Sequence, residues 1–180
     1  MDDTIEYLGK AWVDYLNNRH GTSVRHSDLR FWDVSIAFPE LTNNQVYAPL
    51  YEDDFWKTVK PIPGAAEVLE KLMKDGHRVF IVTASSWQTL PSKIKNVLFR
   101  YFPFVTWDQV IVTNNKQIIS GDVLVDDAPH NLVNGDYIRI LMDAPHNWDF
   151  DESTIDAVRF KNWNDIYDHI TLISKVLEGI

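Results

Sequence analysis

Polar side chains of the kind that bind phosphate groups or divalent cations directly follow two apolar runs of this sequence. Thr83 follows the run at residues 79–82, and Asp126 and Asp127 follow the run at residues 123–125. Hard cations such as Mg²⁺ prefer oxygen ligands, commonly one or two carboxylates together with water and a substrate phosphate. A hydroxyl and two adjacent carboxylates around one crevice would suit that chemistry.

Each of these residues also has a purely structural explanation. A Thr at the end of a strand often caps the following turn, and Asp126-Asp127 before an Ala-Pro pair can form the N-cap of a helix. Lys116 lies in a polar Asn-Asn-Lys loop and indicates nothing alone. Asp143 also precedes an Ala-Pro pair, so we interpret it as a turn residue and leave it out of the site.

The elements that must position these residues are apolar runs that alternate with helical segments. Continuous rather than alternating apolar strands indicate a sheet that is buried on both faces, as parallel sheets are. We therefore predict an α/β fold with a doubly wound, mostly parallel, Rossmann-like sheet, in which ligands bind at the carboxyl ends of the strands. The predicted strands are residues 79–82, 110–112, 123–125 and 138–142, and the predicted helices are residues 8–20, 41–55, 65–74, 87–101 and a last helix that begins near residue 163.

Composition and charge exclude several classes of function. The 180 residues carry a formal net charge of −9, so the surface repels polyanions and we expect no nucleic-acid polymer as a partner. Because the sequence has no cysteine, a disulfide framework, a thiolate nucleophile and a Cys-ligated zinc site are excluded. The apolar runs are too short to cross a bilayer, and the first residues lack the features of a signal peptide. We expect no membrane partner and a cytoplasmic location.

The polar residues occur in an order that resembles the four motifs of the haloacid dehalogenase superfamily. These are an acidic Asp2-Asp3-Thr4, then Thr83 after a strand, then Lys116, and then Asp126-Asp127 after another strand. The resemblance narrows to the 5′(3′)-deoxyribonucleotidase family through Pro61-Ile62-Pro63-Gly64-Ala65 and through Val112-Thr113, Lys116, Ser120, Asp122 and Leu124-Val125-Asp126-Asp127. The chain therefore resembles that family over most of its length.

The resemblance implies a Mg²⁺-dependent phosphomonoesterase that hydrolyses (deoxy)nucleoside monophosphates through an aspartyl-phosphate intermediate. Asp2 would be the general acid and base, and its backbone carbonyl would bind the metal together with Asp126 or Asp127. The groups that would hold the phosphoryl oxygens are Thr83, the Ala84 backbone N–H, Lys116, Ser85 and, as a second contact, Lys93. A solvated helix charge is the alternative for Lys93. The family often has Ser where Ala84 stands, which would alter a phosphate contact.

The resemblance also implies a domain organisation. Residues 1–8 and 60–180 would form the core, and residues 9–59 would form a small helical cap inserted after the first motif. Aromatic residues of the cap and of the loop after Thr83 would enclose a nucleobase, with the packing of the cap itself as the alternative: Phe31, Trp32, Phe55, Trp56 and Trp87, with Trp56 first. A homodimer is a further possibility.

The nucleophile is the main departure from the family pattern. The family's nucleophilic Asp would stand immediately before Met1, at the end of a central strand, and this residue is absent from the sequence. Omitted upstream residues, a truncation, and a degenerate non-catalytic relative are the three explanations. Two other functions therefore stay open: a superfamily phosphatase for another small phosphate ester such as a sugar phosphate, and a non-catalytic phosphate-binding module.

Overall fold

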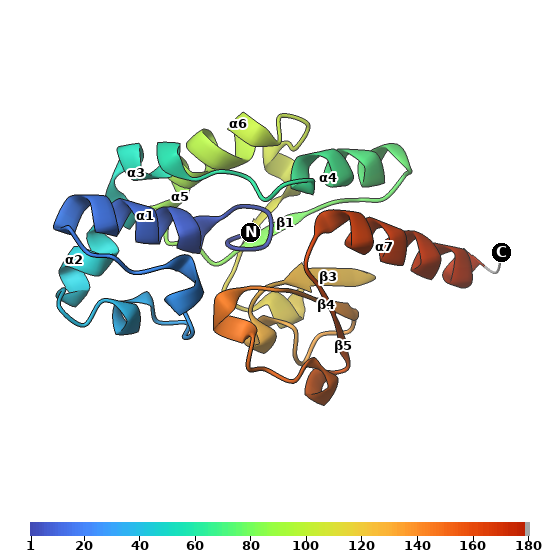
Figure 1. The fold of residues 1–180 in the computed structure, drawn as a ribbon. Helices are drawn as coiled ribbons and strands as arrows, with labels where there is room; N and C mark the ends of the chain where they lie inside the picture. Colours follow the sequence, from blue (N-terminus) through green and yellow to red (C-terminus); the bar gives the residue numbers. More distant parts are fainter. Residues whose placement is uncertain (179–180) are drawn as a thin grey trace.

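Parallel strands and flanking helices build the protein, which is described by a computed structural model over residues 1–178 (Figure 1). Strand β1 (Ile81–Thr83) pairs in parallel with β2 (Val110–Val112). Strand β3 (Val123–Asp126) pairs in parallel with β4 (Ile138–Met142), which pairs in parallel with β5 (Ala157–Phe160). The predicted α/β class with a mostly parallel sheet is therefore confirmed.

The sheet differs from the prediction in two ways. It consists of two separate pieces, β1–β2 and β3–β4–β5, because β1 and β3 are not hydrogen-bonded to each other. The first strand also begins two residues later than predicted, at Ile81, and β5 was not predicted at all. Arg159 interrupts the apolar character of β5, and its guanidinium bonds to the backbone oxygens of Asn147 and Phe150. A strand whose inner position is occupied by a charged side chain leaves no apolar run in the sequence.

Residues 8–58 form a helical insert at one end of the molecule (blue to cyan in Figure 1). Helix α1 (Leu8–His20) has the predicted bounds and ends at Gly21, whose φ of 70° is left-handed. The single helix predicted at residues 41–55 is wrong, because the segment forms α2 (Asn43–Tyr47), a 3₁₀ turn at Ala48–Tyr51, and α3 (Asp53–Thr58). Pro49 cannot supply the backbone N–H that a continuous helix would need there.

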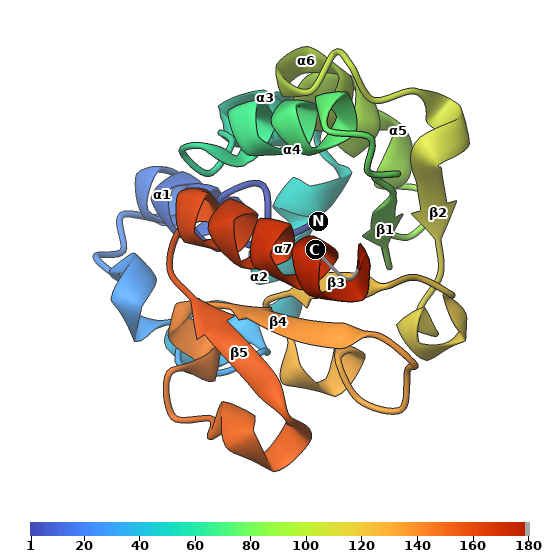
Figure 2. The same ribbon diagram turned by 90° about the vertical axis from the view of Figure 1, so that its right-hand side faces the viewer.

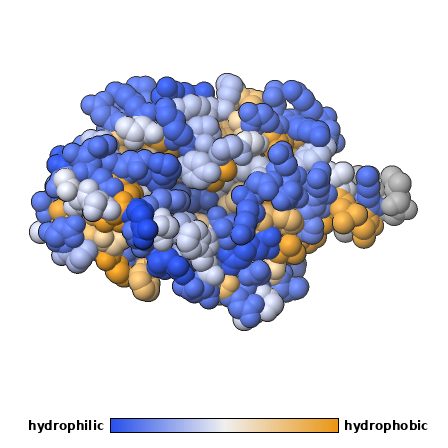
Figure 3. Space-filling view, viewed as in Figure 1, coloured by the Kyte–Doolittle hydropathy of each residue, from blue (hydrophilic) through white to orange (hydrophobic). Residues whose placement is uncertain are grey.

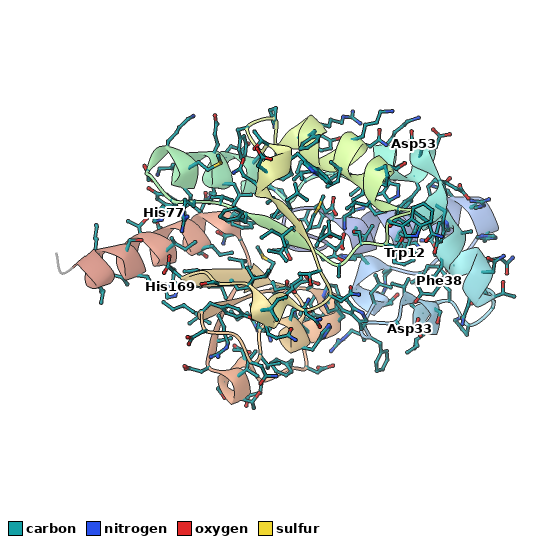
Figure 4. All side chains as sticks on the ribbon, turned by 180° about the vertical axis from the view of Figure 1, so that it is seen from behind. Trp12, Asp33, Phe38, Asp53, His77 and His169 are labelled. Atoms are coloured by element: carbon teal, nitrogen blue, oxygen red, sulfur yellow. The ribbon has the colours of Figure 1, made fainter. Side chains whose placement is uncertain are left out.

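The insert contributes buried residues to the hydrophobic core of the protein. Phe38 is fully buried and Trp12 is nearly so, and both lie inside the insert in Figure 4. The indole nitrogen of Trp12 donates a hydrogen bond of 2.7 Å to the carbonyl of Val46, which links α1 to α2. This hydrogen bond fixes the position of α2 relative to α1.

The remaining helices cover the strands. Helix α4 (Ala65–Lys74) packs against α7 (Trp163–Glu178), as Figures 1 and 2 show. The helix predicted at residues 87–101 begins at residue 90 and contains α5 (Leu90–Lys93), a π-helical turn at Ile94–Leu98, and α6 (Phe99–Tyr101). Residues 179–180 of the predicted core lie outside the described part of the chain.

The first residues of the chain run through the interior of the protein. Figures 1 and 2 both place the N-terminus near the middle of the molecule, and Met1 and Ile5 are buried. Ile62 donates a backbone hydrogen bond of 2.9 Å to Ile5, and the Trp163 indole donates one of 2.9 Å to the Thr4 carbonyl. Next to this segment is a cavity of about 400 Å³, lined by β1, β3, α4, α7 and residues 1, 4 and 5.

The surface is mainly hydrophilic on the face drawn in Figure 3, with separate apolar patches. One patch lies on α7 near the C-terminal end, where Leu172 and Val176 are exposed. Within residues 1–178, no helix has the length and apolar character that crossing a membrane requires.

Candidate active site

A buried ammonium group gathers the first set of predicted site residues. Lys93, the last residue of α5, is 1% exposed, and its Nζ forms an ion pair with Asp2. The same Nζ donates hydrogen bonds to Ser85 Oγ at 2.8 Å and to Thr83 Oγ1 at 3.2 Å. Because Thr83 ends β1 and Ser85 follows two residues later, the end of this strand, the start of the chain and α5 meet at one point.

The charge on Asp2 depends on this contact. Burial alone would raise the pKa of Asp2, but the Lys93 ammonium and the other neighbouring groups together outweigh that effect and hold the pKa below its usual range. Glu6 is a second acid near this ammonium group. It is fully buried, and its Oε1 lies 3.7 Å from Lys93 Nζ. Burial raises the pKa of Glu6 well above its usual range. Sequence reasoning missed Glu6, whose only signal is its position four residues after Asp2.

The second set lies at the end of β3. Lys116 and Asp126 form a buried ion pair, in which both side chains are at most 6% exposed. Asp126 Oδ1 also accepts hydrogen bonds from the backbone N–H of Ala128 at 3.0 Å and from Asn131 Nδ2 at 2.9 Å. Burial would raise the pKa of Asp126, but the Lys116 ammonium and the hydrogen bonds to the carboxylate together outweigh that effect, so the pKa is lowered. Lys116 is therefore not a solvated loop residue.

Asp127 connects β3 to the start of the chain. The Thr4 hydroxyl lies 3.0 Å from Asp127 Oδ1 and also 3.0 Å from the backbone carbonyl of Asp2. His146 Nε2 lies 2.9 Å from Asp127 Oδ2, and sequence reasoning missed this histidine because it stands in a loop with no other chemical signal. Burial and the neighbouring Asp127 raise the pKa of Asp3 to about 7.

The two sets meet at the backbone nitrogen of Met1. This nitrogen is buried, and it lies near Asp2 and Lys93 of the first set and near Lys116 and Asp126 of the second. The structure thus gathers the predicted catalytic residues at one place, at the carboxyl ends of β1 and β3.

Oxygen donors for a hard cation lie in the same place. A Thr4 hydroxyl has one proton, so it cannot satisfy both the Asp2 carbonyl and Asp127 Oδ1, and one of these oxygens keeps its lone pairs free. Carboxylate and carbonyl oxygens are the ligands that Mg²⁺ prefers, so the donor set fits this ion. Over residues 1–178, no three His, Cys, Asp or Glu side chains are close enough together to form a coordination shell by themselves.

The aromatic residues divide into two groups. Phe55 and Trp56 are at most 2% exposed, and the Trp56 indole donates to the Leu50 carbonyl at 2.8 Å, so neither ring offers a free face to a ligand in this structure. By contrast, Trp87 is 80% exposed in the loop that follows β1, in which Ala84 is also exposed.

Two further aromatic residues of the insert are exposed. Phe31 and Trp32 are each 59% exposed. The Trp32 ring packs edge-on against His130 and His146, with ring centres 5.0 Å and 5.2 Å apart. Trp32 thereby connects the insert to the loop that carries the partner of Asp127.

Comparison with solved structures finds a protein with a similar fold. The fold is similar to that of a hydrolase from Pseudomonas syringae, with a TM-score of 0.55 and 13% sequence identity over 96% of this chain and 95% of that one. The chain shares with that protein a parallel α/β fold, and in this chain the fold gathers Thr83, Lys116 and Asp126-Asp127 beside Asp2.

Sequence comparison then identifies the family. A family model described as "5' nucleotidase, deoxy (Pyrimidine), cytosolic type C protein" matches residues 1–177. A 5'(3')-deoxyribonucleotidase of Bacillus subtilis is 33% identical over 167 residues, which are 92% of each chain. One of Clostridium acetobutylicum is 29% identical over 163 residues, which are 91% of this chain and 87% of that protein. The chain belongs to this family of nucleotide phosphatases.

Proposed function

We propose that the protein is a Mg²⁺-dependent phosphomonoesterase that hydrolyses (deoxy)nucleoside monophosphates through an aspartyl-phosphate intermediate. The observation that carries this proposal is the convergence of Asp2, Thr83 and Ser85 on the Lys93 ammonium. An ammonium group and two hydroxyls that surround one point can bind three oxygens of a phosphoryl group. The family membership supports a nucleotide as the substrate.

The nucleophile is an Asp joined to the backbone nitrogen of Met1, at the end of an extended segment that fills the cavity between β1 and β3. This assignment is supported by the buried position of the Met1 nitrogen next to Lys116 and Asp126 and by the apolar strands that line the cavity. A carboxylate at that point would lie beside both sets of site residues, the one around Lys93 and the one around Lys116. Parallel strands on both sides offer backbone groups to an added strand.

The reaction then takes place in two displacements. A carboxylate oxygen of the nucleophile attacks phosphorus and the ester P–O bond breaks. Asp2, which takes up a proton once the phosphate has displaced its carboxylate from the Lys93 ammonium, gives that proton to the leaving oxygen. Asp2 next removes a proton from a water molecule, whose oxygen attacks phosphorus and breaks the bond to the nucleophile, releasing inorganic phosphate. Thr83, the Ala84 N–H and Lys116 hold the phosphoryl oxygens during both displacements.

Asp126 or Asp127 and the Asp2 carbonyl would hold the magnesium ion. When bound, the ion neutralises the charge of the phosphate and lets an anionic carboxylate approach it. Its support in the structure is the shared Thr4 hydroxyl, which leaves one of the two oxygens beside it free to bind a cation.

The helical insert of residues 9–59 acts as the cap that selects the leaving group. The exposed rings of Trp32 and Trp87 are the aromatic surfaces on which a base can stack, since Trp56 and Phe55 are buried. A contact between substrate and Trp56 stays a prediction, as do a cytoplasmic location and a homodimer.

A panel of substrates tests the function. Protein that includes the residues upstream of Met1 is incubated with Mg²⁺ and with deoxynucleoside monophosphates, nucleoside monophosphates and sugar phosphates, and inorganic phosphate is measured. We expect release from the nucleotides, reduced at least 100-fold by Asp2→Asn. No release from any nucleotide would reject the proposal, and faster release from sugar phosphates would reassign the substrate to the second class considered above.

A further inference from the structure

Glu6 is a buried acid to which the proposed reaction gives no role. Its side chain is fully buried, and neither carboxylate oxygen has a hydrogen-bond partner within the described part of the chain. Burying a charged or polar group without partners is unfavourable, so such a group needs an explanation. Lys93 Nζ, 3.7 Å from Oε1, is the cation nearest to it among the ion pairs of the structure.

The backbone of Glu6 is held firmly in place. It forms a parallel bridge with Asp2 and an antiparallel bridge with Pro61. The two residues next to Glu6 are hydrogen-bonded to residues 60 and 62, each at 2.9 Å. The Ile62 N–H donates to the Ile5 carbonyl, and the Tyr7 N–H donates to the Lys60 carbonyl. The direction of the Glu6 side chain is therefore set by the junction between the core and the helical insert.

Lys93 is in a position where a second carboxylate matters. Its ammonium forms an ion pair with Asp2 and donates hydrogen bonds to the hydroxyls of Thr83 and Ser85. When a phosphate group binds to these hydroxyls, it competes with Asp2 for the ammonium. Glu6 is then the carboxyl group that still faces Lys93 from within the protein.

We propose that Glu6 is a positioning residue that holds the Lys93 ammonium beside Thr83 and Ser85 and so builds the phosphate subsite. The inference rests on the proposed function only for the identity of the anion, a phosphate group. Glu6 acts through Lys93 and does not touch the phosphate. A plain electrostatic effect would have the opposite sign, because removing a negative charge close to an anion site strengthens anion binding.

The test is the affinity of the chain for inorganic phosphate, measured by isothermal titration calorimetry without nucleotide. We expect Glu6→Met to weaken phosphate binding about tenfold, since a misplaced ammonium loses its charge-assisted hydrogen bond. Glu6→Gln, which keeps the length of the side chain and an oxygen that can face Lys93, should lose less. Glu40→Gln is the matched control, because it makes the same substitution at an exposed position.

A double-mutant cycle separates positioning from a structural role. Glu6→Met introduced into a Lys93→Met background should leave the phosphate affinity unchanged, because its effect passes through Lys93. If Glu6→Met does not fold, Glu6→Gln takes its place in the cycle. Unchanged or tighter phosphate binding by the Glu6 variants overturns the inference, and so does an equal effect with and without Lys93, or absence of phosphate binding by the wild-type chain.

Failure of this inference can be distinguished from failure of the proposed function. A chain that binds phosphate through Glu6 and Lys93 but releases none from any nucleotide would reject the function alone. A chain that hydrolyses nucleotides while its Glu6 variants keep the wild-type phosphate affinity would reject the positioning role alone.

Discussion

Replacing Lys116 with Met tests whether the ion pair at the end of β3 supports the fold. The substitution keeps the length of the side chain but removes the charge that faces Asp126, and both partners are almost completely buried. Asp126 would retain two hydrogen bonds, from the Ala128 N–H and from Asn131, but no neighbouring lysine. A buried carboxylate without a cation is more costly than the intact pair.

The magnitude follows from the burial of the pair. Removing one partner of a buried ion pair typically costs about 3–5 kcal/mol, and the two remaining hydrogen bonds place Lys116→Met at the lower end, about 3 kcal/mol. For a chain of 150–250 residues, 1 kcal/mol corresponds to about 2–4 °C, so Tm should fall by about 6–12 °C at pH 7. The pKa of Asp126 is lowered in the folded state, so the stability given by the pair is present above pH ~4 and is lost at lower pH. The difference in Tm between wild type and variant should therefore shrink in acid.

Thermal unfolding followed by circular dichroism is the assay. Lys95→Met is the matched control, because Lys95 is exposed and the same substitution removes the same charge there. Adding Asp126→Asn to Lys116→Met should restore part of the lost stability, since it removes the unpaired carboxylate. If Lys116→Met lowers Tm by no more than Lys95→Met, the ion pair does not support the fold and the reasoning is wrong.

Three further predictions concern charge, metal and substrate. The pKa of Asp3 is raised to about 7, so ionisation of Asp3 destabilises the folded state as the pH rises from about 4 to 7. Asp3→Asn should therefore raise Tm by about 2–6 °C at pH 8 but not at pH 4, as measured by calorimetry without divalent metal. Removal of metal with EDTA should abolish phosphate release, and added Mg²⁺ should restore it, as a colorimetric phosphate assay would show. Trp87→Ala should raise KM for nucleotides about tenfold in steady-state kinetics and leave Tm unchanged, because this ring is exposed and free to stack on a base.

Several elements of the fold follow from local sequence. Helix α1 was predicted with its observed bounds because its apolar residues recur with helical spacing and Gly21 can adopt the left-handed conformation that ends it. Thr83, Asp126 and Asp127 were placed at strand ends because the runs before them are continuously apolar. Both signals are local, so they do not depend on how the chain packs.

The other features depend on contacts between distant segments. The break of the predicted helix at residues 41–55 is an exception, because Pro49 is a local signal for it. Strand β5 could not be recognised, because Arg159 satisfies its charge through residues 143–152, in the irregular segment that precedes the strand. Glu6 and His146 gain their significance only through Lys93 and Asp127, which no local pattern reveals.

The charges gathered in the site also explain why a divalent cation is needed for the proposed chemistry. The two buried lysines, Lys93 and Lys116, are each already in contact with a carboxylate before any substrate binds. More carboxyl groups than lysines lie in the same region: Asp2, Asp3, Glu6, Asp126 and Asp127. A phosphate dianion that enters this region meets no surplus of positive charge, so its affinity must come from protonation of some of these acids or from a bound cation. The response of phosphate affinity to Mg²⁺ at pH 8, where protonation contributes least, distinguishes these two sources.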